Sequence, residues 1–410
     1  MEEFLKEAKD SSRIISSLSG NEKNRILLQM AEAISKNKDF ITKANNKDMI
    51  AGQAANLSSA MLDRLLLDDN RIEAMADAIR EIAMLKDPVG RILEGWVTPN
   101  GLNIQKTSIP IGVIGIIYES RPNVTSDTAV LCFKSGNVCV LKGGKEAENS
   151  NIAIAQILQS VLMLNKLPVA AISILPDSSR EGVAKLIRQK DFVDLIIPRG
   201  GEALIKFITE NSAVPVVKHD KGLCHTFIDK NANPKTAVQI CINAKCQRPG
   251  VCNAMETLLV HKDIAYVILP PLYEAFMEQK TELRGCDLTK RIIDCQDATD
   301  EDFATEYLAN ILSIKIVGSV KEACEHIATF GSGHSDAIIS EDYSSVEYFM
   351  NHVDSACVYA NASTRFTDGG AFGFGAEVGI STNKLHSRGP MGINDLTTYK
   401  YKVFGTGQIR

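Results

Sequence analysis

Residues 109–118, with the sequence Ile-Pro-Ile-Gly-Val-Ile-Gly-Ile-Ile-Tyr, limit the possible folds of this chain more than any other segment. The segment is apolar on both alternating faces, as a strand must be when helices cover it on each side. Further strand-like runs follow, separated by stretches in which apolar residues have helical spacing. This alternation predicts a doubly wound α/β domain with a parallel sheet. The later strands are predicted at 137–141, 170–175, 194–198 and 214–217, and two of the helices at 151–163 and 181–187.

The patterns on either side of this domain indicate a second one. The chain has 410 residues, which is more than a single core usually organises. The first hundred residues are mainly helical, and a second α/β region begins near Thr226. In this region, a helix capped by Asn233, with Pro234 at its first position, is predicted to run to about Cys246. Its strands are predicted at 226–229, 257–260, 311–317, 336–339 and 356–360.

Two segments of alternating polarity complete the predicted architecture. Residues 96–104 alternate around Pro99-Asn100-Gly101, which is a strong signal for a β-hairpin. The tail, 396–404, alternates like a strand but has no obvious internal partner. It can pair with the hairpin or with another subunit, and the sequence leaves both options open.

Composition narrows the class of partner. The formal net charge of −5 gives no overall attraction to nucleic acid or to a membrane surface, and no apolar run approaches the length of a membrane span. The ten cysteines contain no CxxC pair, and the seven histidines show no paired ligand spacing. We therefore predict no metal site and no disulfide framework. A small-molecule partner and a reducing, cytoplasmic setting are expected.

Three loops that follow predicted strands are candidates for ligand binding, because ligands of such sheets lie beyond the carboxyl ends of the strands. They are 119–123, 142–146 and 199–202, and the last two contain a Gly-Gly pair beside a basic residue. Paired glycines let backbone amides approach a phosphate, which favours a nucleotide cofactor. The alternative is that the glycines only close tight turns. No GxGxxG fingerprint is present, which argues against a standard dinucleotide-binding fold.

The turn 247–253, Gln-Arg-Pro-Gly-Val-Cys-Asn, holds the candidate nucleophile, Cys252. A Pro-Gly turn at the end of a helix can keep a sulfur atom at a fixed point. Arg248 raises the local potential and so favours the thiolate, which is the reactive form. A buried structural cysteine is the other interpretation. Further along, the glycine-dense segment 368–377 suggests a backbone that folds tightly over another group.

Taken together, these motifs resemble the aldehyde dehydrogenase superfamily over nearly the whole chain. The resemblance implies an α/β fold of two doubly wound domains plus an oligomerisation arm made from a β-hairpin and the C-terminal tail, with a cofactor domain that lacks GxGxxG. It also implies a homo-oligomer, either a dimer or a tetramer. The implied regions are an NADP-binding domain at 1–227 with the hairpin at about 94–108 inserted, a catalytic domain at 228–390 and an oligomerisation tail at 391–410. The similarity rests on residues 111–125, 134–137, 141–144, 247–252 and 377–382.

More narrowly, the chain resembles the branch of the superfamily that reduces an acyl phosphate. This implies reduction of L-glutamyl 5-phosphate by NADPH to L-glutamate 5-semialdehyde and phosphate, for proline biosynthesis, through a thioester on Cys252. The side-chain amide of Asn123 and the backbone N–H of Cys252 would stabilise the oxyanion. The alternative for Asn123 is a helix cap. We expect the chain to act as a separate enzyme, and a functional handoff from glutamate 5-kinase is compatible with this.

The resemblance also assigns residues to the cofactor and the substrate. Lys142 matches a position beside the adenine-side ribose, where its charge would suit a 2′-phosphate, so NADP is preferred over NAD. Arg121 and Arg248 are candidates for the anionic groups of the substrate, and Glu119 or Glu377 for its ammonium group. The alternative for these four is an ion pair within the protein. The implied cofactor-binding residues are Lys142, Gly143, Gly144, Pro198, Arg199, Gly200, Gly201 and Glu377.

One departure from the hydrolytic aldehyde dehydrogenases bears on mechanism. Where those enzymes carry Glu-Leu-Gly-Gly-Lys, this chain reads His-Asp-Lys-Gly-Leu at 219–223. Without the glutamate we expect slow attack of water on the thioester, although His219 remains a candidate base. Three other functions stay open: an acylating enzyme that uses coenzyme A, a cofactor-free cysteine acyltransferase or hydrolase that pairs Cys252 with His225 or His219, and a non-catalytic scaffold. The presence of both Cys252 and Asn123 argues against the scaffold.

Overall fold

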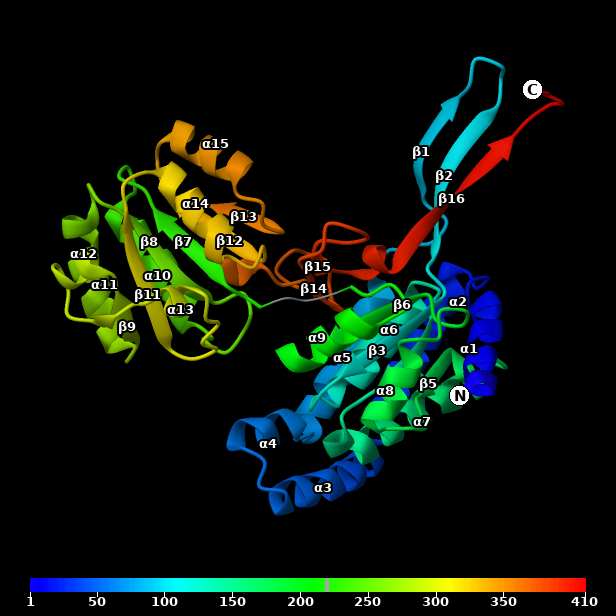
Figure 1. Ribbon diagram of the computed structural model, residues 1–410. Helices are drawn as coiled ribbons and strands as arrows, with labels where there is room; N and C mark the ends of the chain where they lie inside the picture. Colours follow the sequence, from blue (N-terminus) through cyan, green and yellow to red (C-terminus); the bar gives the residue numbers. More distant parts are fainter. Residues whose placement is uncertain (218–220) are drawn as a thin grey trace. The chain divides into compact units, whose positions relative to one another are not determined.

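The structure is a computed structural model that describes residues 1–217 and 221–410, and it divides the chain into two compact units. The first unit comprises Met1–Lys218, Phe374–Gly379 and Met391–Arg410, and the second comprises His219–Gly373 and Ile380–Pro390. Each unit contains its own parallel sheet with helices, which confirms the predicted α/β class (Figure 1). None of the helices in the described part of the chain has the length and hydropathy that a bilayer crossing requires.

The first unit is built on a four-stranded parallel sheet in the order β5-β4-β3-β6. Its central strand, β3, is buried at all six positions, as its apolar sequence requires. The strands are β3 (Val113–Tyr118), β4 (Val138–Lys142), β5 (Ile172–Ile174) and β6 (Leu195–Arg199). The connecting helices are α6 (Asn123–Lys134), η1 (Lys145–Ala147), α7 (Glu148–Leu164), η2 (Val169–Ala171), α8 (Arg180–Leu186) and α9 (Glu202–Asn211).

Five helices precede this sheet in the chain, as the helical spacing of the first hundred residues predicted. The second begins at a capping box in which Ser19 and Glu22 bind each other's backbone N–H groups. The second and fifth helices pack on each other and on α6 (Figure 1). The five helices are α1 (Glu2–Ile15), α2 (Gly20–Lys36), α3 (Lys38–Ala54), α4 (Ser59–Leu65) and α5 (Asp69–Met84).

Two predicted strands of this unit have different bounds in the structure. The run 109–118 is split, because one strand ends at Pro110 and β3 begins at Val113. Between them Gly112 has a φ of +131°, and a Cβ atom there would overlap the Asp194 carboxylate that accepts the Val113 N–H at 2.8 Å. The predicted strand 214–217 is reduced to a single bridge between Val216 and Ile196.

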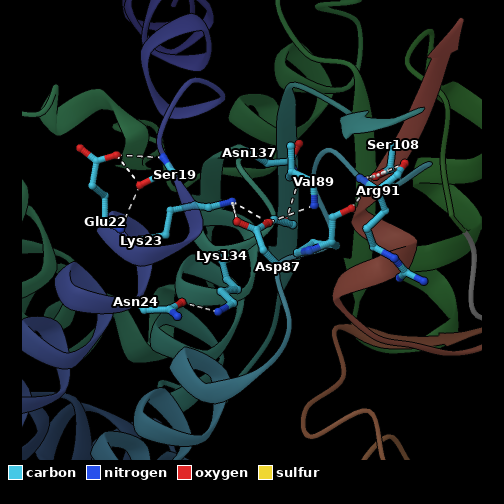
Figure 2. Close-up of polar contacts among 12 residues, drawn as sticks. Ser19, Glu22, Lys23, Asn24, Asp87, Val89, Arg91, Ser108, Lys134 and Asn137 are labelled. Carbon is cyan, nitrogen blue, oxygen red and sulfur yellow. Dashed lines mark hydrogen bonds and ion pairs between the residues drawn. The ribbon is translucent and has the colours of Figure 1, made fainter. Parts of the chain in front are cut away.

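A buried polar network ties the helical layer to the root of the hairpin (Figure 2). Lys23 of α2 is almost fully buried and pairs with Asp87 at 2.7 Å, and Asp87 also accepts the Val89 N–H. Lys134 of α6 is buried as well and donates to the Ala83 carbonyl at 2.9 Å and to Asn24. Because a buried cation without partners is costly, these contacts specify how α2, α5 and α6 meet.

A three-stranded antiparallel arm extends from the rest of the first unit (Figure 1). The predicted hairpin is formed by β1 (Ile92–Val97) and β2 (Asn103–Pro110). The C-terminal strand β16 (Thr397–Phe404) pairs with β2, so the first of the two predicted partners is confirmed. Every residue of β1 is exposed, and Trp96 meets Tyr401 edge to face across the sheet, with the ring centroids 6.1 Å apart.

The second unit has a seven-stranded parallel sheet in the order β10-β9-β11-β8-β7-β12-β13. The predicted helix is confirmed as α10 (Pro234–Cys246), and the Asn233 side chain caps it. The strands are β7 (Cys224–Ile228), β8 (Met255–His261), β9 (Glu282–Gly285), β10 (Gln296–Asp297), β11 (Ile311–Val317), β12 (Ser335–Ile339) and β13 (Cys357–Ala360), of which β9 and β10 were not predicted. The other elements of this unit are α11 (Ala265–Glu278), α12 (Asp287–Lys290), α13 (Asp300–Phe303), α14 (Val320–Phe330), α15 (Tyr343–His352) and η3 (Thr364–Phe366). The short strands β14 (Gly379–Ser381) and β15 (Gly389–Met391) each have residues assigned to both units, and η4 (Ile393–Leu396) belongs to the first unit.

Candidate active site

The three predicted loops meet at the carboxyl edge of the four-stranded sheet. Ser120, after β3, donates from its backbone N–H and from its hydroxyl to Glu146, at 2.7 and 2.6 Å, and so joins the first loop to the second. Glu119 accepts the Gly201 N–H at 2.8 Å and joins the first loop to the third. A Cβ at Gly200 would come within 2.5 Å of the same carboxylate. Gly200 is therefore needed for close packing of the loops, whereas a Cβ at Gly201 would make an ordinary contact with the carboxylate at 3.8 Å.

Asn123 lies at the start of α6 but does not cap it. The N-cap residue is Pro122, and the Asn123 side-chain amide donates to the Asp127 carboxylate at 2.9 Å. Desolvation raises the pKa of Asp127 to about 6, although this hydrogen bond and the positive charge of Arg199 oppose the rise. An asparagine amide has two N–H donors. Asp127 therefore orients the amide while one donor remains for a ligand.

A pocket of about 300 Å³ opens beside the loop that follows β4. Three of the predicted cofactor residues line it, namely Lys142, Gly143 and Gly144. A Cβ at Gly143 would overlap the side-chain amide of Asn151, so this position requires glycine. Burial lowers the pKa of Lys142, and the nearby Glu146 and Glu119 oppose that shift. The remaining lining residues are Glu148, Asn151, Ile152, Ile174, Leu175, Pro176 and Ser178.

This pocket fits part of a nucleotide. Its apolar residues, Ile152, Ile174 and Leu175, can contact a planar ring, while Lys142 supplies positive charge beside them. The side-chain nitrogen of Asn151 is buried and has no hydrogen-bond partner in the protein, although its oxygen accepts from Thr125 at 2.9 Å. An unpaired buried donor is costly unless a ligand satisfies it. The pocket therefore offers a ligand an apolar surface, a positive charge and an unpaired donor.

The other predicted cofactor residues lie outside this pocket lining. Pro198 is buried within β6, and Arg199 is partly buried at the end of the same strand. Gly200 and Gly201 begin the loop after it. Glu377 is partly buried in the irregular segment before β14. Pro198, Arg199, Gly200 and Gly201 thus lie at the same sheet edge as Lys142, and Glu377 is the last residue of the glycine-dense segment.

Cys252 lies on a turn between α10 and β8, as predicted, and its side chain is partly exposed. A buried ion pair brackets this turn, because Lys245 near the end of α10 contacts Glu256 near the start of β8 at 2.6 Å. Burial raises the pKa of Glu256 to about 7 and lowers that of Lys245. Both shifts disfavour the charged form, so for each side chain the loss of hydration outweighs the attraction of its partner.

The backbone of Cys252 rests on the segment that leads into β7. The Cys224 thiol donates to the Cys252 carbonyl at 3.2 Å, and burial raises the pKa of Cys224. A Cβ at Gly222 would overlap the Cα and carbonyl atoms of Cys252. The Gly222 N–H is in turn held by Glu306 at 2.9 Å. The observed position of Cys252 therefore requires glycine at position 222, because any side chain there would displace the Cys252 backbone.

The remaining predicted residues are placed as follows. Arg121 and Arg248 are both exposed, the first on the loop before α6 and the second on the Cys252 turn. His225 is fully buried in β7, where its Nδ1 lies 2.9 Å from Asp336. A side chain sealed in the core is a poor partner for an external substrate, which weakens the hydrolase alternative built on His225. His219 lies outside the described residues.

Several residues of the two sites were not found from the sequence. Asn151 is the first residue of the helix predicted at 151–163, and the loop at 175–178 begins at the end of a predicted strand but contains neither glycine nor a basic residue. The strand pattern alone could have pointed to this loop, because it shares the sheet edge with the others. Arg365, which contacts both ends of the Cys252 turn, is far from it in sequence and carried no local signal.

Comparison with known proteins identifies the family of the chain. A model of the aldehyde dehydrogenase family matches residues 1–285. The chain therefore belongs to the aldehyde dehydrogenase family. Among its full-length relatives within that family are the gamma-glutamyl phosphate reductases of Nitratiruptor sp. and Aliarcobacter butzleri, at 66% and 65% identity, with 100% of each chain covered.

Solved structures of aldehyde dehydrogenases and of a gamma-glutamyl phosphate reductase also match the chain. The gamma-glutamyl phosphate reductase of Thermotoga maritima matches with a TM-score of 0.98 and 44% identity, over 100% of this chain and 99% of that one. An acetylating aldehyde dehydrogenase from Geobacillus thermoglucosidasius matches with a TM-score of 0.70 and 19% identity, over 100% and 97% of the two chains. The second likeness supports the fold alone.

Proposed function

We propose that this chain reduces L-glutamyl 5-phosphate to L-glutamate 5-semialdehyde and phosphate with NADPH, as a step of proline biosynthesis. The observation that carries the proposal is the full-length identity of 66% to a gamma-glutamyl phosphate reductase. The partly exposed Cys252, on a turn held from several sides, supports the covalent chemistry. We assign NADP binding to the first unit and the nucleophile to the second.

In the proposed mechanism the Cys252 thiolate attacks the carbonyl carbon of the acyl phosphate. A carbon–sulfur bond forms, and the bond between the carbonyl carbon and the bridging oxygen of the phosphate group breaks. Phosphate leaves with the electron pair of that bond, so that a thioester remains. The nicotinamide cofactor, when bound, supplies the hydride that lowers the thioester to the oxidation level of an aldehyde. Cys252 then leaves as the thiolate and the aldehyde is released.

The negative charge on the carbonyl oxygen requires donors that are already in position. We propose the side-chain amide of Asn123 and the backbone N–H of Cys252 for this role. Support for Asn123 comes from its bond to Asp127, which orients the amide and leaves one N–H free. Loss of one such donor typically costs about 2.7–4 kcal/mol of barrier.

The pocket beside β4 is the proposed binding site for the adenosine part of the cofactor. Lys142 supplies a positive charge that suits a 2′-phosphate, and Asn151 supplies an unpaired N–H. Gly143 and Gly144 allow close approach of the backbone. We propose that Pro198, Arg199, Gly200, Gly201 and Glu377 also contact the cofactor.

For the substrate we propose Arg121 and Arg248 as contacts of the anionic groups and Glu119 or Glu377 as contacts of the ammonium group. Both arginines are exposed, so an anionic group in solution can reach them. Glu119 uses one carboxylate oxygen for Gly201, and its other oxygen remains for the substrate. A kcat/KM that stays unchanged in Arg121→Ala would remove that residue from the proposal.

We also propose a cytoplasmic homo-oligomer, a dimer or tetramer, with a functional handoff from glutamate 5-kinase. None of the ten cysteines, all of which lie in the described part of the chain, forms a disulfide, which suits a reducing compartment. The arm exposes aromatic and aliphatic side chains, including Trp96, Tyr399, Tyr401 and Phe404, and this supports association through the arm.

The test is an assay of NADP⁺ reduction with glutamate semialdehyde and phosphate. Cys252→Ser should abolish the activity, whereas Cys246→Ser, which changes a partly buried cysteine at the end of α10, should retain most of it. A requirement for coenzyme A in place of phosphate would point to the acylating alternative. Rapid aldehyde oxidation without phosphate or arsenate would contradict a thioester protected from water.

A further inference from the structure

We propose that Arg365 is the positioning residue of the nucleophile: its guanidinium joins the two ends of the Cys252 turn and holds a positive charge beside the thiolate. This inference rests on the proposed function only in taking Cys252 as the nucleophile. Arg365 was not predicted from the sequence, and it lies 112 residues from Asn253, the nearer end of the turn. Four observations within the second unit lead to it.

The first observation is that the segment around Arg365 packs directly against the turn. Arg365 is the middle residue of η3, which follows β13 in the chain. On one side of it, the Thr364 hydroxyl donates to the Asn253 carbonyl at 2.8 Å. On the other side, the Thr367 carbonyl accepts from the Asn253 side chain at 2.8 Å. Asn253 is buried and directly follows Cys252, so this segment restrains the residue next to the sulfur.

The second observation is the bridge itself. Arg365 donates from Nε to Gln247 Oε1 at 2.8 Å and from Nη1 to Asn253 Oδ1. Gln247 is the first residue after α10, and Asn253 is the residue after Cys252. Because the guanidinium is planar and its donors have a fixed spacing, the two bonds set the separation of the turn's ends. A lysine has a single nitrogen and cannot reproduce both bonds in this geometry.

The third observation concerns charge. Arg365 is only partly exposed, whereas Arg248 on the same turn is exposed. Burial lowers the pKa of Arg365, Arg248 lowers it further, and Asp368, Cys252 and Cys224 oppose the shift. The guanidinium thus interacts electrostatically with Cys252, and an arginine keeps its charge at neutral pH. A partly desolvated cation stabilises a nearby thiolate more than an exposed one does, because water screens it less.

The fourth observation is that the bridge is one of several independent restraints on the turn. The Lys245–Glu256 pair joins the elements on either side, and Gly222 with Cys224 lies against the Cys252 backbone. Loss of Arg365 therefore leaves other contacts in place, and a variant should keep its fold. Among the described residues, the charged and titratable groups around the turn and the Cys224 thiol include Arg248, Arg365, Asp368, Cys224, Lys245, Glu256, Glu306, His334 and Asp336.

The experiment measures the rate at which iodoacetamide alkylates Cys252 as a function of pH, with the labelled residue identified by mass spectrometry. In Arg365→Gln the midpoint of the profile should rise, and the rate at pH 7 should fall roughly tenfold, which corresponds to one pKa unit. The rate at high pH should be retained, because the thiol stays accessible. In Arg365→Lys the midpoint should stay near that of the unaltered enzyme, while kcat falls roughly ten- to a hundredfold because the bridge is lost.

Two controls separate position from charge. Arg291→Gln removes an exposed arginine elsewhere in the same unit and should change neither the alkylation profile nor kcat. Gln247→Ala removes one bond of the bridge at an exposed residue and keeps the charge, so kcat should fall several-fold with an unchanged midpoint. This variant also keeps the inference testable if Arg365→Gln does not fold.

Two results would overturn the inference: an alkylation profile of Arg365→Gln that superimposes on that of the unaltered enzyme, or an unchanged kcat in Gln247→Ala. The alkylation result is independent of the reductase assay, whereas the kcat result is measured in it. If Cys252→Ser kept full reductase activity, the proposed function would fail, while the alkylation profiles would still report whether Arg365 acts on that thiol.

Discussion

The two units prepare their sites in opposite ways. In the first unit the loops beside β4 leave a pocket of about 300 Å³ and an unpaired buried donor on Asn151. In the second unit the Cys252 turn is held by an ion pair, a glycine contact and an arginine bridge. A binding pocket must leave space and unmet hydrogen bonds for its ligand, whereas a nucleophile must already be in position before the reaction. The difference predicts where substitutions affect stability, chemistry or affinity.

The largest effect is expected from the buried ion pair that brackets the turn. Lys245→Met leaves Glu256 buried without its partner and should lower the free energy of unfolding by about 3–5 kcal/mol. Chemical denaturation measures this, with the exposed Lys262→Met as the matched control. The double variant Lys245→Met/Glu256→Met should recover most of the loss, because no charge is then left unpaired. A loss below about 1 kcal/mol in the single variant would contradict the idea that this pair restrains the turn.

The second prediction concerns the glycine that lies against Cys252, the proposed nucleophile. Gly222→Ala places a methyl group where Cys252 has its Cα and carbonyl atoms, so the turn must move, and kcat should fall roughly a hundredfold. Gly250→Ala, within the Cys252 turn itself, is the matched control, because its Cβ would meet nothing closer than the Leu308 carbonyl at 3.5 Å. Cofactor affinity, measured by NADPH fluorescence, should stay the same in both. Equal kcat values for the two variants would show that the turn tolerates displacement.

The third prediction tests the open pocket of the first unit. Lys142→Ala should weaken NADP⁺ binding roughly tenfold or more and NAD⁺ binding much less, because a charge-assisted bond to the 2′-phosphate is lost. Titration calorimetry with both cofactors measures the difference. Lys145→Ala, three residues further along and exposed, is the control. If both affinities fall equally, Lys142 does not select the phosphorylated cofactor.

At neutral pH the smallest effect is expected away from both sites, at His326 in the second unit. Burial, together with the charges of His225 and Lys315, lowers the pKa of His326 from 6.5 to about 3. The unfolded chain then binds a proton between pH 6.5 and 3 that the folded chain does not, so stability falls as the pH falls through this window. The contribution is about 1.4 kcal/mol per pH unit.

His326→Phe should remove this part of the pH dependence, because the ring packs beside Phe303 and Phe330 without a titrating nitrogen. Urea unfolding at pH 7, 6 and 5 measures the slope, and the exposed His352→Phe is the control. The same slope in both variants would mean that His326 titrates alike in the folded and unfolded chains.

Local rules were sufficient for part of this architecture. The start and end of α10 follow from the Asn233 cap, from Pro234 and from the Pro-Gly turn beyond Cys246. The hairpin follows from Pro99-Asn100-Gly101, and β11 has the bounds predicted for 311–317. In each case the determining residues are neighbours in sequence, so their effect does not depend on the rest of the fold.

The failures share the opposite cause. The apolar run 109–118 concealed a break, because the conformation of Gly112 is imposed by Asp194, which lies more than eighty residues away. The short strand β10 was missed because pairing with β9, rather than its own two-residue pattern, makes it a strand. Asn151 appeared to be an ordinary helix residue until the fold placed it in the lining of a pocket.

The sequence by itself determined which chemistry is available to this chain: a cysteine after a rigid turn, basic glycine loops at strand ends, and the α/β alternation that carries them. Only the tertiary structure decided what holds that cysteine and what remains open for a ligand. The reason is that hydrogen bonds such as those of Arg365 to Gln247 and Asn253 join residues more than a hundred positions apart. Contacts of this kind exist only after the sheet has brought its strand ends together.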